Sequence, residues 1–308
     1  MTGILASLLG ALSQGILWGI MALGVYITFR VLDIADLTVD GSFATGGSVC
    51  AIAIVSGVHP LLAVVLAIGA GMITGFVTGI LIARFEIPAI LAGILTQIGL
   101  YSINLRIMGR SNLPLLRSNT LFKSVSAFTG LSIVQSALLV GICTTIIVIL
   151  LLYWFFGTEI GSAIRATGNN EKMAAALGIN TSSVKVLGLM ISNGFIALSG
   201  ALITQSQGYA DVKMGTGAIV IGLASIVIGE VIFGSKRSFG TRLVSIIIGS
   251  IIYRIIIAIV LRLGLNTDDL QLVSATLVGV SLIIPILIGR QKQVNLYKKL
   301  TGKEKHHA

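Results

Sequence analysis

Long apolar stretches recur along the whole sequence, and they limit the folds that the chain can adopt. They cover residues 4–29, 61–83, 131–156, 184–203, 218–233, 243–260 and 272–288, with further apolar runs before residue 58 and over residues 89–103. Most approach the roughly 20 residues with which an α-helix crosses a hydrocarbon core. A transmembrane barrel would instead show alternating segments of about ten residues. The sequence therefore predicts an all-α polytopic protein of the cell membrane, with eight to ten transmembrane helices and some broken or re-entrant segments.

The charged residues support this class. Only 10% of the 308 residues are charged, compared with about 25% in soluble proteins. A net charge of +10 would point to nucleic acid in a soluble protein. Here Lys and Arg gather in the loops, as the positive-inside rule requires of a membrane protein. We therefore expect the chain to contact membrane lipid and no nucleic acid.

Basic residues also orient the chain. The tail at residues 291–308 is basic, as are the turn at Lys236 and Arg237 and the polar loop at residues 157–183. The positive-inside rule places all three in the cytoplasm, and the even number of predicted spans between them agrees. We expect residues 1–290 to form one transmembrane domain. The side of the amino terminus stays open, because residues 89–103 could either cross the membrane or re-enter.

Residues 165–180 form a polar island between two apolar stretches. Asn169 or Asn170 can cap a helix, because a short side-chain oxygen accepts a bond from an orphan backbone N–H. Glu171 would then lie at the positive end of the helix dipole. Gly178 can supply the left-handed residue that ends the helix. The island thus predicts a helix of about two turns, too short to cross a bilayer.

Three acidic residues, Asp33, Asp36 and Asp40, follow the first apolar stretch. On one helix their spacing would place them on one face. A helix break here could line or brace a solute pathway, since a charge inside a membrane usually faces a polar cavity or a partner. Alternatively, the acids lie in a solvated loop close to Arg30, and Asp36 or Asp40 caps the next helix.

Four polar residues interrupt other apolar stretches: Gln97, Asn193, Glu230 and Arg254. Such groups more often join helices than bind ligands. Glu230 and Arg254 could pair across neighbouring spans.

A weak internal repeat relates the two halves of the chain. Residues 35–42 (ADLTVDGS) resemble residues 210–217 (ADVKMGTG), and at the same offset Gly47 meets Gly222. Paired polar breaks at corresponding places of two halves usually indicate a translocation path. Chance similarity between two short glycine-rich segments is the alternative.

Nothing in the sequence supports catalysis. His59, His306 and His307 fall in a turn and in the tail, without a Ser/His/Asp set or metal-ligand spacing. The chain has no Gly-x4-Gly-Lys-Ser/Thr loop, so any ATP phosphates would be bound by another chain. We therefore expect a transport subunit that is not an enzyme and holds no cofactor.

The island and the early acidic segment together resemble a known family. The arrangement Arg165-Ala-x-Gly-x-Asn-x-x-x-Ala-Ala-x-x-Gly-Ile-Asn resembles the cytoplasmic coupling segment of ABC importer permeases of the branched-chain amino acid and ribose type. Residues 36–47 look like that family's early broken-helix motif. Residues 222–234 match its late glycine-bearing segment loosely, with Glu230 where a small residue is expected. The resemblance is nearest to uncharacterised or aromatic amino acid importers.

This resemblance implies a type II importer fold and a second copy of the chain, with a translocation path between the two copies. It also implies separate ATPase subunits and an extracytoplasmic solute-binding protein. ATPase coupling is assigned to Arg165, Asn169, Glu171, Ala174, Ala175 and Gly178. The translocation path is assigned to Asp36, Asp40, Ser42, Gln97, Asn193 and Glu230.

The solute expected from the resemblance is a small molecule of the amino acid type, with a nucleoside or a sugar as the alternative. A different class also fits the broken helices. In an ion-coupled secondary transporter, Asp36, Asp40 or Glu230 would be the ion-coupling residues.

Overall fold

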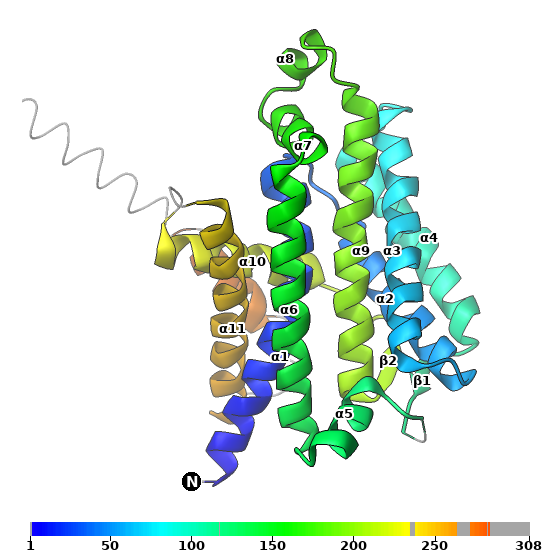
Figure 1. The fold of residues 1–308 in the computed structure, drawn as a ribbon, viewed down its shortest axis with the longest axis vertical. Coiled ribbons are helices and arrows are strands. Elements are labelled where there is room, and N and C mark those ends of the chain that lie inside the picture. Colours follow the sequence, from blue (N-terminus) through cyan, green and yellow to red (C-terminus); the bar gives the residue numbers. More distant parts are fainter. Residues whose placement is uncertain (1, 117, 235–237, 264–271, 282, 284–308) are drawn as a thin grey trace, which may run out of the picture.

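The computed structural model describes residues 2–116, 118–234, 238–263, 272–281 and 283, and most of these residues are helical (Figure 1). Six of the described helices are long and apolar enough to cross a membrane. They are α1 (Thr2–Tyr26), which the π-helical turn η1 (Ile27–Val31) extends, α3 (Pro60–Ala83), α4 (Ala89–Met108), α6 (Ile133–Gly157), α9 (Thr181–Gln207) and α11 (Phe239–Arg262). The shorter apolar helices are α2 (Val39–Val55), α10 (Ala218–Phe233) and Leu272–Ser281. The all-α multi-pass class is confirmed, and the number of crossings stays a prediction.

Parts of the predicted topology lie outside the described residues. They are the basic turn at Lys236 and Arg237, the end of the predicted span 272–288 and the basic tail at residues 291–308.

The remaining elements gather at the two ends of the long helices. At one end, α7 (Glu159–Asn169) and α8 (Glu171–Ala176) join α6 to α9 (Figure 1). At the other end lie α5 (Leu121–Thr129), the start of α1 and a small antiparallel sheet (Figure 1). In this sheet β1 (Asn112–Pro114) pairs with β2 (Tyr209–Asp211), and Leu113 is the partner of Ala210. Because α4 leads to β1 and is long enough to cross, residues 89–103 fit a span better than a re-entrant segment.

Two short helices, α2 and α10, begin side by side inside the molecule. Their starts are the two copies of the sequence repeat, residues 35–42 and 210–217. Asp40, in the first turn of α2, accepts hydrogen bonds from the backbone N–H groups of Gly217 (2.8 Å) and Ile219 (3.0 Å) at the start of α10. The two repeated segments are therefore in direct contact.

From this point the two short helices run toward opposite ends of the molecule. α2 runs to the last turn of α9, where the Gln205 Nε2 donates to the Cys50 Sγ (3.3 Å). α10 runs to η1, where Glu230 forms an ion pair with Arg30. The long helices α1 and α9, which precede them, also run in opposite directions (Figure 1). Inverted repeats with discontinuous helices near the bilayer midplane are typical of membrane transporters.

A buried carboxylate fastens the break before α2 to the middle of α9. Asp36 is buried between η1 and α2, and its Oδ2 accepts a hydrogen bond from the Asn193 Nδ2 (2.8 Å). Its Oδ1 accepts a bond from the backbone N–H of Thr38 (2.9 Å). Asn193 is fully buried, and its Nδ2 also donates to the Leu189 carbonyl (3.0 Å). Since a charge away from water needs partners, these bonds hold the break against α9.

Serine hydroxyls join the long helices around this centre. Ser192 and Ser199 of α9 donate to the carbonyls of Gly24 (2.8 Å) and Leu17 (2.7 Å) on α1. Ser250 of α11 likewise donates to the carbonyl of Gly15 on α1 (2.8 Å). Lipid tails provide no hydrophobic force between helices, so close packing and such bonds hold a bundle together. α1 is thus clamped between α9 and α11.

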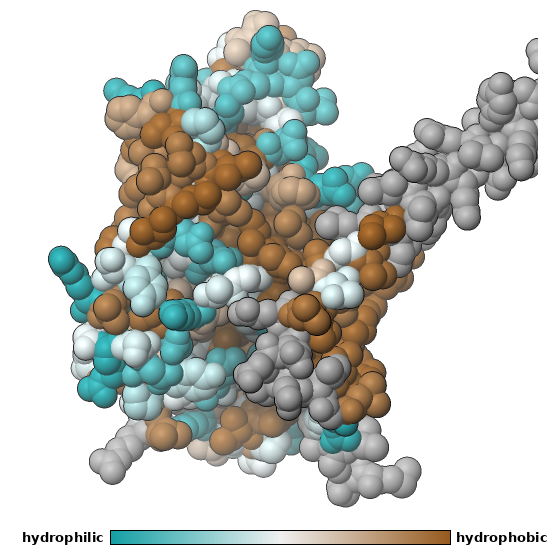
Figure 2. Space-filling model, turned by 180° about the vertical axis from the view of Figure 1, so that it is seen from behind, coloured by the Kyte–Doolittle hydropathy of each residue, from teal (hydrophilic) through white to brown (hydrophobic). Residues whose placement is uncertain are grey.

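Much of the outer surface is apolar. In Figure 2, hydrophobic side chains form broad patches on the flanks, and hydrophilic side chains lie at the end that carries α8 and in a second region on one side, at and below mid-height. Large exposed apolar residues on α3, α4 and α6 contribute to this surface, among them Leu61, Ile73, Ile98, Leu150 and Trp154. Such a surface suits contact with lipid tails and agrees with a multi-pass membrane protein.

The bond between Asp36 and Asn193 gives a first prediction. Asn193→Ala leaves a buried carboxylate with one partner fewer, which should lower the free energy of unfolding by about 1–3 kcal/mol. The apparent melting temperature of the detergent-solubilised chain measures this. Asn112→Ala is the matched control, because Asn112 also pairs with an aspartate, Asp211, but on the exposed surface (3.3 Å); its effect should stay below about 0.5 kcal/mol. Equal losses of stability in the two variants would contradict a stabilising role for the buried bond between Asp36 and Asn193.

Candidate functional site

The polar island folds as two helices, and Asn170 separates them. The backbone of Asn170 is extended, with φ −157°, which ends α7, while its Oδ1 accepts a bond from the backbone N–H of Met173 (3.0 Å) and caps α8. Glu171 is the first residue of α8, and Gly178 has a φ of +84° just after the helix. The predicted cap, acidic start and glycine end are confirmed. The helix is shorter than predicted, and Arg165 lies on α7 because the asparagine breaks the island.

Most of α8 is exposed. Glu171 forms an ion pair with Lys185 at the start of α9 (2.5 Å), which ties the two helices together. Ala175 is exposed, whereas Ala174 is fully buried, so Ala174 anchors α8 to the rest of the fold. Met173 and Leu177 are 49% and 71% exposed. These two apolar residues were missed in the sequence analysis, although their spacing of four places them on one helix face.

α7 packs directly on the end of the first long helix. Gly168 of α7 approaches η1 so closely that a Cβ atom there would lie 1.8 Å from the carbonyl oxygen of Val31. No side chain fits at that distance, so only glycine allows this contact. Ile164 and Thr167, on the same helix, are buried. A displacement of α7 must therefore move η1 as well.

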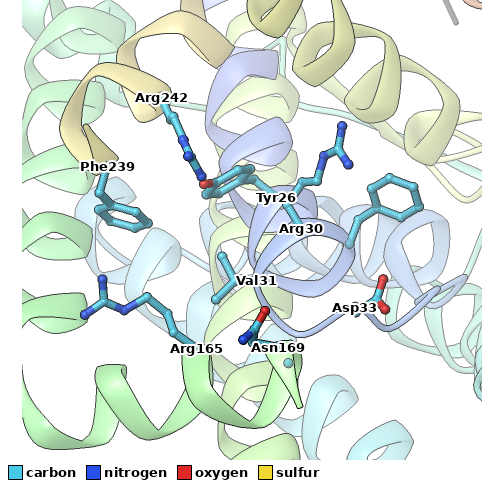
Figure 3. A pocket seen from close by; sticks show the side chains of 10 residues that line it. Tyr26, Arg30, Val31, Asp33, Arg165, Asn169, Phe239 and Arg242 are labelled. Carbon is cyan, nitrogen blue, oxygen red and sulfur yellow. The ribbon is translucent and has the colours of Figure 1, made fainter. Parts of the chain in front are cut away.

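A cavity of about 570 Å³ lies where α7, η1 and the start of α11 meet. Figure 3 shows Arg165 and Asn169 entering it from α7, Arg30 from η1 and Arg242 from α11. Asp33 is the carboxylate among its lining residues, so the lining carries more positive than negative charge. The predicted coupling residues Arg165 and Asn169 are thus brought together with the ends of two long helices.

The three early acids occupy three different environments. Asp33 is exposed and has a φ of +56°, and Asp36 is buried between η1 and α2. Only Asp40 lies on a helix. The predicted shared helix face is therefore wrong, because the chain is broken between Val31 and Val39. The alternative of a solvated loop holds for Asp33 but not for Asp36, which is buried. Asp40 caps α10, in the other copy of the repeat, and does not cap its own helix α2.

Of the other residues assigned to the path, Ser42 and Gln97 lie between α2 and its neighbours. The Ser42 and Thr74 hydroxyls are hydrogen-bonded (2.6 Å), which joins α2 to α3. Gln97 is half-buried on α4, and its Cα lies next to Gly41 of α2. Together with Asp36, Asp40 and Asn193, these residues surround the broken-helix centre.

Glu230 lies away from this group. It pairs with Arg30, so the expected pairing with Arg254 is wrong. The reason is the direction of α10, which carries Glu230 toward the end of α1. Arg254 instead stacks on Trp18 of α1, with its guanidinium carbon 4.2 Å from the ring centroid. No sequence pattern indicated this cation–π contact.

These features define a class of protein. Two inverted halves meet at broken helices inside the membrane region, and an exposed short helix is attached to the end of a long one. This is the architecture of a multi-pass membrane transport protein.

Comparison with known proteins identifies the family. The family described as the permease component of branched-chain amino acid transport systems matches residues 7–286. The chain therefore belongs to this family and is a permease component of the ABC importer type.

Individual relatives agree with this assignment. A tyrosine transport system permease protein of Clostridioides difficile is 42% identical over 89% of this chain and 90% of its own length. An uncharacterised protein of Rickettsia prowazekii, RP368, is 35% identical over 89% of this chain and 96% of its own. The ribose import permease protein RbsC of Escherichia coli is 24% identical over 93% of this chain and 86% of its own. No solved structure matches.

The close contact at Gly168 gives a second prediction. Gly168→Ala should push α7 off η1 and lower the free energy of unfolding by about 1–3 kcal/mol, the range for overpacked sites. Gly157→Ala is the control, because a Cβ atom at Gly157 meets nothing within 4 Å. Its melting temperature should equal or exceed that of the parent chain, since alanine favours a helix over glycine. An unchanged melting temperature in Gly168→Ala would show that the packing of α7 does not depend on this contact.

Proposed function

We propose that this chain forms, as a homodimer, the translocation path of an importer for an amino acid, and that α8 docks into ATPase subunits that hydrolyse ATP on separate chains. The observation that carries the proposal is the arrangement of the two short surface helices. α8 is exposed with Met173 and Leu177 outward, while α7 is locked to η1 at Gly168. One helix thus offers a contact surface, and the other connects that surface to the membrane part.

The contacts support a simple mode of coupling. When ATP binding closes the ATPase subunits, α8 and α7 are displaced together, because Asn170 alone separates them. α7 then moves η1, which it contacts at Gly168, and through η1 also α1 and the helix α11 packed on α1. The ends of η1 and α11 line the cavity of Figure 3. Since α1 and α11 flank the broken-helix centre, their displacement shifts the population between inward-open and outward-open states.

The same proposal orients the chain. The end that carries α8 faces the cytoplasm, in agreement with the predicted position of the island. Because α1 begins at the opposite end of the molecule (Figure 1), the amino terminus faces outward on this proposal. The end that carries α5 and the small sheet then meets the extracytoplasmic solute-binding protein.

An aromatic amino acid is the solute that the comparisons favour. The tyrosine permease of C. difficile matches nearly the whole chain at 42% identity, and the ribose permease of E. coli only at 24%. The solute-binding protein is expected to make most of the selection, and the permease has to accept the same solute during passage.

Docking of α8 gives a third prediction. The double variant Met173→Asp and Leu177→Asp should weaken binding of the ATPase subunits by about 30-fold or more, as expected when a docking hot spot is lost. Both side chains are exposed, so the melting temperature of the chain should stay unchanged. Co-purification of the ATPase subunits and ATP-driven uptake measure the effect.

Leu116→Asp is the matched control for this experiment. Leu116 is 80% exposed and lies two residues after β1, at the end opposite to α8, so its replacement should leave ATPase binding intact. Replacement of Glu171 and Gly178 by arginine should uncouple the complex in the same way as the double variant. If coupling survived both sets of changes, the assignment of α8 would be wrong.

The solute gives a fourth prediction. Proteoliposomes that contain the permease, its ATPase subunits and its solute-binding protein should take up tyrosine only when ATP is enclosed. Excess phenylalanine should compete more strongly than excess ribose. Uptake by the permease alone, driven by an ion gradient, would instead favour a secondary transporter, and competition by ribose but not by amino acids would favour a sugar permease.

A further inference from the structure

Arg254 is a charged residue in the second half of α11, inside a predicted membrane span. A charge at this depth is costly, and it usually marks a functional site. The guanidinium carbon lies 4.2 Å from the ring centroid of Trp18, and Trp18 in turn stacks on Phe43 of α2, with 4.8 Å between the ring centroids. The Arg254 side chain therefore lies on the face of Trp18, the first of two stacked rings from α1 and α2.

No carboxylate in the described part of the chain neutralises Arg254. Glu230 pairs with Arg30, and Asp36 accepts its bonds from Asn193 and Thr38. Asp40, at the start of α2, is occupied by the backbone of α10. The Arg254 Nε is enclosed and has no hydrogen-bond partner among the described residues. A cation–π contact compensates only part of the cost of a desolvated charge.

A second enclosed donor lies next to Arg254. Tyr253 is 1% exposed, and its hydroxyl has no hydrogen-bond partner within the described chain. Both residues line a cavity of about 480 Å³, which is a usual size for a small-molecule site. The cavity has apolar walls at Val220 and Ile257, and it reaches Gly217, where the two broken helices meet. It therefore lies beside the centre of the proposed translocation path.

We propose that this cavity binds the carboxylate of the transported amino acid. The guanidinium of Arg254 forms charge-assisted hydrogen bonds with the carboxylate oxygens, and the Tyr253 hydroxyl donates a further bond. The apolar wall at Val220 and Ile257 faces the side chain of the solute. This inference rests on the proposed function, since it requires a solute that carries a carboxylate.

Trp18 provides a direct test of binding. The chain has two tryptophans, Trp18 and Trp154, and Trp154 is 68% exposed on α6, so Trp154→Phe leaves Trp18 as the single reporter beside Arg254. The purified permease with this change is titrated with tyrosine, with its desamino analogue and with tyramine, which lacks the carboxylate. Tyrosine and the desamino acid should change the Trp18 fluorescence, whereas tyramine should not. A response to tyramine as strong as that to tyrosine, or no response to any of them, would overturn the proposal.

Variants then assign the effect to Arg254. In the Trp154→Phe background, Arg254→Gln should weaken tyrosine binding about 10- to 100-fold, the loss expected for hydrogen bonds to a charged group. Tyr253→Phe should cause a smaller loss. Arg106→Gln, at an exposed position of α4, is the matched control and should bind tyrosine like the parent. If Arg254→Gln does not fold, the comparison of tyrosine with tyramine in the parent background still decides the proposal.

Transport separates this inference from the proposed function. In the complete complex, Arg254→Gln should reduce ATP-driven tyrosine uptake, while ATPase binding at α8 stays intact. Unchanged uptake by Arg254→Gln would overturn the cavity's role and leave the importer function standing. If the unmodified complex imported no amino acid at all, the proposed solute would fail, whatever Trp18 reports.

Discussion

The contact between Asp40 and the start of α10 makes the rest of this structure possible. A helix that begins inside a membrane exposes orphan backbone N–H groups, and each unsatisfied group costs several kcal/mol where water is absent. The Asp40 carboxylate accepts bonds from two of these groups, at Gly217 and Ile219. Asp36 satisfies the N–H of Thr38 at the start of α2. Two shorter helices can therefore meet at the centre while six longer ones pack around them.

An ion pair and a close backbone contact link the centre to the surface. α10 starts at Asp40 and ends where Glu230 pairs with Arg30 of η1. η1 is in contact with Gly168 of α7, and α7 leads to the exposed helix α8. A continuous series of backbone contacts and one ion pair thus connects α8 to the broken helices. Packed elements of this kind transmit motion because they shift between discrete arrangements and do not deform gradually.

Whether a feature could be predicted from the sequence depends on how far apart along the chain its interacting residues lie. The lengths of the apolar stretches indicated the spans. Local rules narrowed the cap to Asn169 or Asn170 and located the final glycine at Gly178, because both features act within one helix turn. The partners of Asn193 and Glu230 lie 157 and 200 residues away along the chain, and only the packing of the helices determines them. For the same reason, the burial of Ala174 beside the exposed Ala175 could not be read from two adjacent alanines.

The charged residues on the apolar helices and at their breaks fall into two groups, those with polar or charged partners in the chain and those without. Asp36, Asp40 and Glu230 each have donors or a counter-charge supplied by the chain itself, which suits residues that brace the fold. Among the residues that the structure describes, Arg254 contacts the face of Trp18, and its enclosed Nε has no hydrogen-bond partner. An apolar residue at this position would cost less than a buried arginine. On the proposal above, the carboxylate of the solute supplies the opposite charge during transport.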